Sequence, residues 1–377
     1  MRPFLNAIRS LESRPTEEIA YFLCLFFLGL LTPSSNIAQT SLTYTLSTED
    51  FDYYLVQAFN ADRPTNRQSI NHLGIEGTIL ANGVAVTGVL EGYPAHDVGI
   101  RRGDIILTIN GKPFHPVLTL NPDASRQIFE PDLTPVSLRY LRNNITRTSI
   151  LDVVYENLYD SYRTATFNSV LQFNSGNKVI GYVRLWAISR STNDLSTFRE
   201  ILSNLDQCDG IILDLRSGYG FLDYAHFASF LSYDEMKSTL GKDTFNENTS
   251  VNTALISGEI ESSGSLTYRR PLGILIDSQT SGSSAFFASA LAQLNRTVVI
   301  GDTSAGKFGT FHENKKITRP NGERIFLYHP GPYGKQYEFV NEGRGLIPDQ
   351  KVLFPFNKNI AGDIQFDTAV LTLLSII

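Results

Sequence analysis

Two glycine-containing turns carry the side chains of this sequence best suited to nucleophilic chemistry. The first reads TSGSS and contains Ser281, Gly282 and Ser283, and the second reads SAGKF and contains Lys307. A serine hydroxyl attacks a carbonyl when a base takes its proton, and a lysine serves as that base when apolar neighbours keep its amine neutral. A serine at a helix N-terminus also lies beside backbone N–H groups that stabilise an oxyanion. The two turns are therefore candidates for a serine–lysine pair, although a serine cluster before a helix is more commonly a cap.

The pattern of strands and helices predicts that these two turns lie side by side. The apolar run LGILID ends at Asp277, a helix is expected from about residue 283 to residue 294, and the apolar run TVVIGD ends at Asp302. This order forms a strand–helix–strand unit, in which the carboxyl ends of both parallel strands lie at the same edge of the sheet. We therefore expect both turns at one sheet edge.

The rest of the chain divides into segments of different periodicity. Residues 39–71 form a helical lead-in, and residues 72–155 alternate short strands with glycines, including the hairpin signal Asn110-Gly111. Residues 165–377 alternate apolar strands with helices, which implies crossover connections and a mixed sheet covered by helices. The predicted fold class is α/β (α+β), with a mixed-sheet core, a small β-rich domain and a short N-terminal helical segment.

Charge, cysteine content and the N-terminus restrict the classes of function. A formal net charge of -6 and the lack of a long basic run argue against a nucleic-acid partner. The two cysteines, Cys24 and Cys208, are too few for a cysteine-based metal site. Residues 19–31 are almost entirely apolar, so residues 1–38 are predicted to be a cleaved export signal or, if uncleaved, a membrane anchor. We expect the remaining chain to be periplasmic or extracellular.

Residues 91–114 resemble part of a PDZ domain. The segment EGYPAHDVGIRRGDIILTINGKPF has the order of small and turn residues found in that domain. The residues that carry the resemblance are Ala95, Gly99, Gly103, Asp104, Asn110 and Gly111. PDZ domains bind a peptide as an added strand and capture its terminal carboxylate with a glycine-containing loop. The resemblance implies a peptide-binding loop made of Leu73, Gly74, Ile75 and Glu76.

Residues 165–377 resemble the C-terminal processing (tail-specific) peptidases. Five motifs appear in the order found in that family, namely IGYVRL, GIILDLRSGYG, PLGILIDSQTSGSSA, VVIGDTSAGK and GLIPDQKV. The resemblance implies an exported serine endopeptidase with a lysine general base, whose PDZ domain captures the C-terminal tail of a protein or peptide substrate. It implies no metal ion and no other cofactor.

The resemblance also assigns roles to individual residues. Lys307 falls on the general base, Gly220 on a glycine whose amide helps to form the oxyanion hole, and Gln293 on a polar residue that orients the lysine. The family's serine position falls on Gly282. The expected nucleophile is therefore Ser281, with the Gly282 N–H facing the oxyanion, or alternatively Ser283.

Departures from the family pattern leave a second interpretation open. Ala285 stands where the family carries an acidic residue, and Phe221 replaces a glycine after the DLR motif. Together with Gly282, these residues are consistent with a catalytically inactive relative that binds polypeptide tails in the exported compartment. A serine–histidine triad is not expected because no histidine falls at the predicted sheet edge. Asp214 and Arg216, at a strand end, are expected to form a structural ion pair.

Overall fold

The computed structural model describes residues 45–189, 192–220, 224–240, 267–314, 323–330, 337–356 and 362–377. The predicted export signal or anchor, residues 1–38, and Phe221 lie outside these ranges. No helix in the described ranges is both long enough and apolar enough to cross a membrane. The described residues all belong to one unit that begins at Thr45.

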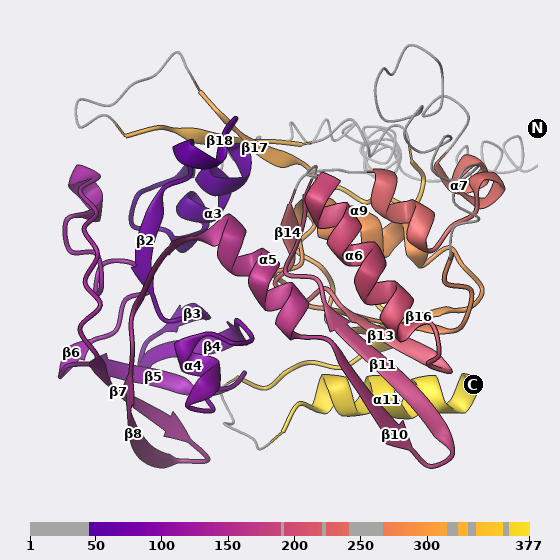
Figure 1. The fold of residues 1–377 in the computed structure, drawn as a ribbon, viewed down its shortest axis with the longest axis horizontal. Coiled ribbons are helices and arrows are strands. Elements are labelled where there is room, and N and C mark those ends of the chain that lie inside the picture. The colour runs from indigo at the N-terminus through magenta and orange to yellow at the C-terminus, as the bar shows by residue number, and fades with distance from the viewer. Residues whose placement is uncertain are drawn as a thin grey trace, which may run out of the picture. The chain divides into compact units, whose positions relative to one another are not determined.

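A six-stranded sheet forms the centre of the larger part of the fold (Figure 1). Its order is β10-β11-β13-β15-β16-β19, in which β10 and β11 are antiparallel and the strands from β11 onward run parallel. Strands buried on both faces need apolar residues throughout, which is why β13 and β15 read GIILD and LGILI. The strand bounds are Leu171–Ser175 for β10, Lys178–Arg184 for β11, Gly210–Asp214 for β13, Leu272–Ile276 for β15, Thr297–Gly301 for β16 and Gln350–Lys351 for β19.

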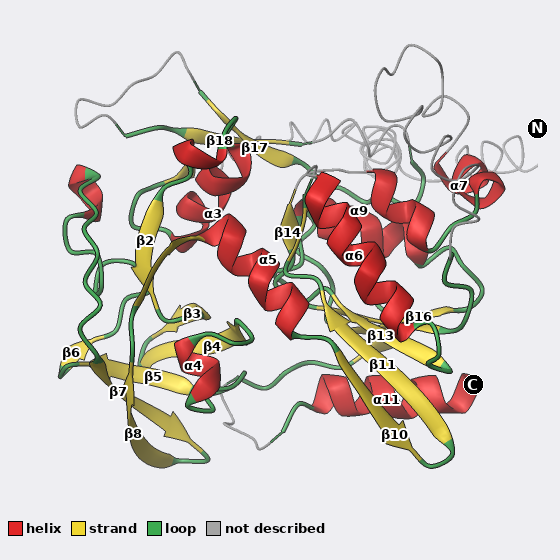
Figure 2. Ribbon diagram, in the orientation of Figure 1, coloured by secondary structure: helices red, strands yellow, loops and turns green. Residues whose placement is uncertain are grey.

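Helices cover both faces of this sheet (Figure 2). Because side chains alternate along a strand, Leu213 packs in one apolar cluster with Phe286 of α9, whereas Ile212 packs in another with Leu373 of α11. Helix α6 lies on the same face as α9 (Figure 1). The predicted α/β (α+β) fold class is confirmed. The helix bounds are Thr192–Leu205 for α6, Gly282–Leu291 for α9 and Ile364–Ile376 for α11.

The β-rich domain is a separate antiparallel sheet with the order β3-β4-β5-β7-β8, to which β6 adds by pairing with β5. Asn110 and Gly111 have φ values of 50° and 78° and form the tight turn between β5 and β6, as the Asn-Gly signal predicts. The bounds are Ile75–Leu80 for β3, Gly83–Val89 for β4, Pro94–Asp97 for α4, Ile105–Ile109 for β5, Lys112–Pro113 for β6, Val136–Arg142 for β7 and Ile145–Leu151 for β8.

The lead-in contains a strand that the sequence pattern missed. Strand β1 (Thr45–Leu46) pairs antiparallel with β18 (Phe326–His329), which pairs in turn with β17 (Thr310–Glu313). Helix α3 (Phe51–Asn60) follows, and the ring of Tyr53 lies 5.2 Å from that of Phe326. The lead-in therefore packs against strands that come after the lysine loop.

The remaining elements connect the two sheets. Strands β2 and β9 pair antiparallel, and β12 and β14 pair in parallel. The bounds are Pro64–Asn66 for η1, Ser69–His72 for β2, Ala124–Arg126 for η2, Val154–Asn157 for β9, Leu158–Asn168 for α5, Ala187–Ile188 for β12, Tyr219–Gly220 for β14, Tyr224–Ser229 for η3 and Tyr233–Leu240 for α7.

Candidate active site

Two backbone hydrogen bonds join the TSGSS turn to the lysine loop. The Gly282 N–H donates to the carbonyl oxygen of Lys307 at 2.7 Å, and the Ala305 N–H donates to that of Thr280 at 3.0 Å. The strands that precede the two turns, β15 and β16, pair in parallel. The structure thus brings both turns to one sheet edge, as the strand–helix–strand order predicts.

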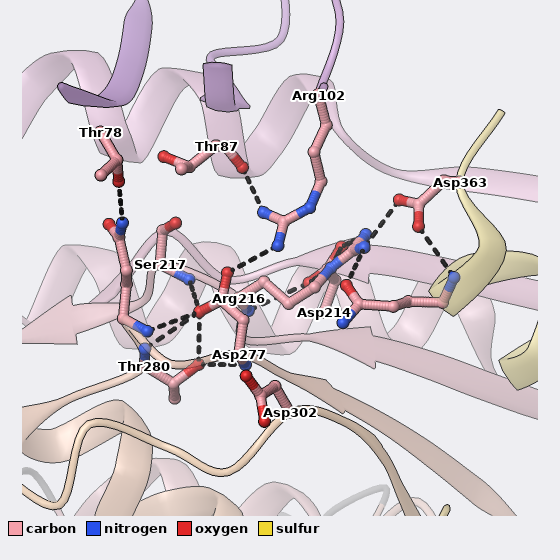
Figure 3. Close-up of polar contacts among 12 residues, drawn as sticks. Thr78, Thr87, Arg102, Asp214, Arg216, Ser217, Asp277, Thr280, Asp302 and Asp363 are labelled. Atoms are coloured by element: carbon pink, nitrogen blue, oxygen red, sulfur yellow. Dashed lines mark hydrogen bonds and ion pairs between the residues drawn. The ribbon is translucent and has the colours of Figure 1, made fainter. Parts of the chain in front are cut away.

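Asp277 shapes the turn between β15 and α9 (Figure 3). Its Oδ1 accepts hydrogen bonds from the N–H groups of Ser217 at 2.9 Å, Gln279 at 3.1 Å and Thr280 at 3.1 Å. Burial raises the pKa of Asp277, but the charge of Arg102 and the Ser217 N–H lower it, and the pKa ends below its ordinary value. Asp277 therefore stays ionised and holds three backbone donors in place.

Gly282 occupies the position that faces Gly220. Its φ is +56°, and a Cβ built on it would lie 3.0 Å from the Gly220 carbonyl oxygen and 3.7 Å from the Gly220 nitrogen. Strand β14 places Gly220 there, next to its parallel partner β12. The Gly220 backbone and the lysine loop therefore converge on position 282, where this chain has no side chain.

The serines around Gly282 lie in different environments. Ser281 is the N-cap residue of α9; it is partly exposed, and its side chain makes no capping hydrogen bond. Ser283 is 3% exposed, and its buried Oγ has no hydrogen-bond partner within the described ranges. Ser284 is also buried, and its Oγ donates to the Tyr219 carbonyl oxygen at 2.9 Å. Of the two candidate nucleophiles, only Ser281 is open to solvent.

A buried ion-pair network fixes the neighbouring strand end. Arg216 donates from Nε to Asp214 Oδ1 at 2.9 Å and from Nη1 to Asp363 Oδ2 at 2.7 Å, which links β13 to the start of α11 (Figure 3). Burial raises the pKa of Asp214, but the Arg216 and Arg184 guanidinium groups outweigh this effect and hold the pKa below its usual range. The predicted Asp214–Arg216 pair is confirmed.

Comparison with known proteins shows which families this chain resembles. Residues 179–352 match the family model of peptidase family S41, and residues 85–131 match that of the PDZ domain. The chain is similar to peptidase family S41 over the segment that runs from β11 to β19. The resemblance to C-terminal processing peptidases with a PDZ domain is therefore confirmed.

Two curated relatives and one solved structure show the extent of the similarity. The chain is 29% identical over 252 residues to a carboxy-terminal-processing protease of Bartonella bacilliformis, covering 65% of this chain and 54% of that protein. It is 28% identical over 234 residues to a carboxyl-terminal-processing protease of Synechocystis, covering 60% and 50%. The chain thus spans about half the length of these relatives. A crystal structure from Bacteroides fragilis, named as an S41 protease, has a TM-score of 0.55 at 14% identity and covers 90% of this chain and 88% of that one, which supports the fold.

Two groups assigned to the S41 site from the family pattern do not take the expected places. Gln293 is exposed, beyond the last residue of α9, and its Nε2 donates to the Ser289 carbonyl oxygen at 3.2 Å. It is separated from Gly282 by the length of the helix, roughly 16 Å at 1.5 Å per residue, and its described side-chain hydrogen bond is made within that helix. The Gly282 N–H donates to Lys307 and is not available to an oxyanion.

Asp52 is a neighbour of Lys307 that sequence patterns did not reveal. It lies in the first turn of α3, and its side chain keeps contact with solvent. The protein packed around the carboxyl raises the pKa of Asp52, whereas the positive charge of Lys307 lowers it. Burial also raises the pKa of Tyr219, and the charge of Asp52 adds to that increase. No local signal marks Asp52, because α3 reaches the candidate site through tertiary contacts, such as those of Tyr53 with Phe326 and of Phe59 with Tyr219.

The residues expected to form the peptide-binding loop of the PDZ domain are buried. The exposed fractions are 2% for Leu73, 5% for Ile75 and 8% for Glu76, and Gly74 is buried as well. The Glu76 carboxyl accepts a hydrogen bond from the hydroxyl of Tyr162 on α5. Leu73 and Ile75 pack in the apolar core of the PDZ sheet itself, whereas Glu76 contacts α5.

Trp186 forms a second close contact between the PDZ domain and the core. Its Nε1 donates to Glu91 Oε2 at 2.6 Å, and the Arg184 guanidinium lies 3.5 Å from the centre of its ring. A Cβ built on Gly88 would lie 2.6 Å from the Trp186 ring. Only glycine lets β4 approach Trp186 this closely.

The described parts of the chain hold no group of three or more histidine, cysteine, aspartate or glutamate residues that could bind a metal ion.

Proposed function

We propose that this chain is an exported serine endopeptidase that cleaves polypeptides, with Ser281 as nucleophile and Lys307 as general base. The observation that carries the proposal is the hydrogen bond from the Gly282 N–H to the Lys307 carbonyl oxygen. This bond holds the Lys307 backbone against Gly282, the residue that follows Ser281. The Ser281 side chain is partly exposed. The export part of the proposal rests on the apolar residues 19–31.

The proposed reaction begins when Lys307 Nζ takes the proton from Ser281 Oγ, while Oγ bonds to the carbonyl carbon of the scissile peptide. The resulting oxyanion is stabilised by backbone N–H groups, for which Gly220 and the first turn of α9 are the candidates. Collapse of the tetrahedral intermediate breaks the C–N bond, and the leaving amine takes the proton from Lys307. Water then hydrolyses the acyl-serine ester, with Lys307 accepting one proton of the water.

The N–H groups of Ser283 and Ser284 support this assignment. In the first turn of a helix these donors have no acceptor within the helix, and no acceptor for them occurs in the described ranges. They replace the Gly282 N–H, which is bonded to Lys307, as candidate oxyanion donors.

The test is cleavage of β-casein by the purified chain and by three single variants. Ser281→Ala and Lys307→Ala should each reduce the rate by at least about a thousandfold. Ser283→Ala is the matched control and should retain the rate, because the Ser283 hydroxyl is buried. Unchanged cleavage by Lys307→Ala would exclude the proposed base.

A fluorophosphonate probe followed by peptide mass spectrometry identifies the reactive serine directly. Labelling of Ser281 supports the proposal, whereas labelling of Ser283 would assign the role of nucleophile to Ser283 instead. If the folded chain is neither labelled nor active, Gly282 favours the second function, a catalytically inactive relative that binds polypeptides.

A further inference from the structure

Strand β3 is an edge strand whose second half is open to solvent. It stands at one end of the PDZ sheet, and no strand in the described ranges pairs with its outer side. Residues 75 and 76 are buried, whereas Thr78 and Ile79 are exposed, Ile79 by 63%. An edge strand presents unpaired N–H and C=O groups, and an extended peptide can pair with them as an additional strand. The open half of β3, residues 77–80, therefore offers both a backbone edge and an apolar side chain.

The loop before β3 is not similarly open. The Gly74 N–H donates to His72 Nδ1 at 3.1 Å. The carbonyl oxygens of Leu73 and Gly74 accept hydrogen bonds from Ala95 N at 3.0 Å and Leu90 N at 2.9 Å. Capture of a terminal carboxylate requires free N–H groups. The Gly74 N–H is not free, because it already donates to the His72 side chain.

A buried hydrogen-bond chain keeps His72 in the state that accepts this N–H. His72 Nε2 lies 3.2 Å from Ser161 Oγ, and Ser161 Oγ donates to Glu156 Oε2 at 2.7 Å. With Nδ1 as acceptor, Nε2 carries the proton and donates to Ser161, so every bond of the chain has one donor and one acceptor. Burial lowers the pKa of His72 to about 4, and the imidazole is neutral at physiological pH.

The Tyr93 side chain closes one side of the loop. Glu156 Oε2 accepts a hydrogen bond from the Tyr93 hydroxyl at 2.6 Å, and the Tyr93 ring stacks on His72 with 5.6 Å between ring centres. A Cβ built on Gly74 would lie 2.5 Å from Tyr93 Cβ, so the loop has no free space on that side. Packing on this side opposes entry of a free C-terminus.

The open half of β3 touches the turn that carries the candidate nucleophile. Gln279 Nε2 donates to Thr78 Oγ1 at 2.7 Å, and Gln279 precedes Ser281 by two residues. A peptide strand added along residues 77–80 would therefore run close to the TSGSS turn. No other described contact brings the outer edge of the PDZ sheet to that turn.

We propose that the PDZ domain of this chain binds an internal, extended segment of an unfolded polypeptide as an added strand on residues 77–80, and that binding needs no free C-terminal carboxylate. The proposal deepens the proposed function, since it specifies the substrate segment that such a peptidase would hold. It concerns binding, so it can be tested independently of cleavage.

The test measures binding to the full chain carrying Lys307→Ala, which keeps the peptide intact. The probe is a fluorescein-labelled peptide of about 12 residues that alternates valine and threonine between terminal lysines, made as the C-terminal acid and as the C-terminal amide. Fluorescence anisotropy should give dissociation constants for the two forms within about twofold. At least about tenfold tighter binding of the acid, or no saturable binding of either form, would overturn the proposal.

Two matched variants locate the binding edge. Ile79→Lys places a charge on the proposed edge and should weaken binding at least about tenfold. Ile150→Lys makes the same change on β8, the opposite edge of the same sheet, where Ile150 is 64% exposed, and should leave binding unchanged. Equal loss in both variants would contradict the assigned edge. Binding without β-casein cleavage by the unmodified chain would refute the proposed function and leave this inference standing.

Discussion

Arg102 of the PDZ domain donates from Nη2 to Oδ2 of Asp277 at 3.0 Å, and the two side chains are only 8% and 6% exposed. Through its other oxygen, the same Asp277 carboxylate holds the N–H groups of Gln279 and Thr280 in the turn before α9 and that of Ser217 in the loop after β13. The Arg102 guanidinium also lies 5.0 Å from the ring centres of Phe354 and Phe356. One buried ion pair therefore links the PDZ domain to the geometry of the candidate active site.

Removal of Arg102 should destabilise the protein strongly. Arg102→Met leaves the Asp277 carboxylate buried without its cation, and breaking a buried pair from one side costs about 3–5 kcal/mol. Urea unfolding followed by circular dichroism measures this loss. Arg126→Met is the control, because Arg126 and Asp123 form an exposed pair, with 70% and 42% exposed side chains, that contributes little. Equal destabilisation by both substitutions would show that burial does not determine how much the Arg102–Asp277 pair contributes to the free energy of unfolding.

Glu76 should make stability fall as pH rises. Burial raises its pKa from 4.5 to about 8, against the opposing charge of Arg184. Between these two values the unfolded chain has lost the Glu76 proton and the folded chain still holds it, so the free energy of unfolding decreases with pH by up to about 1.4 kcal/mol per pH unit. Above the folded pKa this contribution no longer changes.

Glu76→Gln isolates that contribution, because glutamine can still accept the hydrogen bond from Tyr162 and does not titrate. The variant should match the unmodified chain near pH 5 and be more stable by about 1 kcal/mol or more at pH 8. The exposed Glu49→Gln serves as control and should show the pH dependence of the unmodified chain. If the free energy of unfolding depended on pH in the same way for the unmodified chain and for Glu76→Gln, the raised pKa of Glu76 would be contradicted.

Gly282→Ala should cost more stability than a positive φ alone explains. At φ +56° an L-residue is strained by about 1 kcal/mol, and the new Cβ would lie 3.0 Å from the Gly220 carbonyl oxygen. Gly99→Ala, at φ +75° with nothing within 4 Å of its Cβ, measures the strain without the contact. Differential scanning calorimetry should show a larger loss for Gly282→Ala. Equal losses would mean that Gly220 does not crowd position 282.

Gly88→Ala should disturb the contact between the PDZ domain and the core. The added Cβ would lie 2.6 Å from the Trp186 ring, and overpacking of this kind costs about 1–3 kcal/mol. Trp186 is the only tryptophan of the chain and is fully buried, so its fluorescence reports this contact alone. The emission maximum should shift to longer wavelength in Gly88→Ala. It should not shift in Gly273→Ala, where the nearest atom would lie 3.7 Å away.

Much of the fold follows from local patterns in the sequence. The alternation of apolar strands and helices predicts parallel crossovers, and these bring the TSGSS turn and the lysine loop to one edge. The Asn110-Gly111 turn and the Asp214–Arg216 pair follow from residues that are adjacent or two apart. Gln293 shows the limit of this reasoning. The family pattern assigns a role to this residue, but it does not specify the direction in which its side chain points.

The sequence by itself therefore predicted the resemblance to the C-terminal processing peptidases, the fold class and the two segments that face each other at the sheet edge, because periodicity and motif order are local properties. Only the tertiary structure decided that Ser281 is open and Ser283 buried, that the Gly282 N–H bonds to Lys307, and that His72 occupies the Gly74 N–H. Burial and hydrogen-bond partners depend on packing between distant segments. The Arg102–Asp277 pair, 175 positions apart, forms only once the PDZ domain lies against the core.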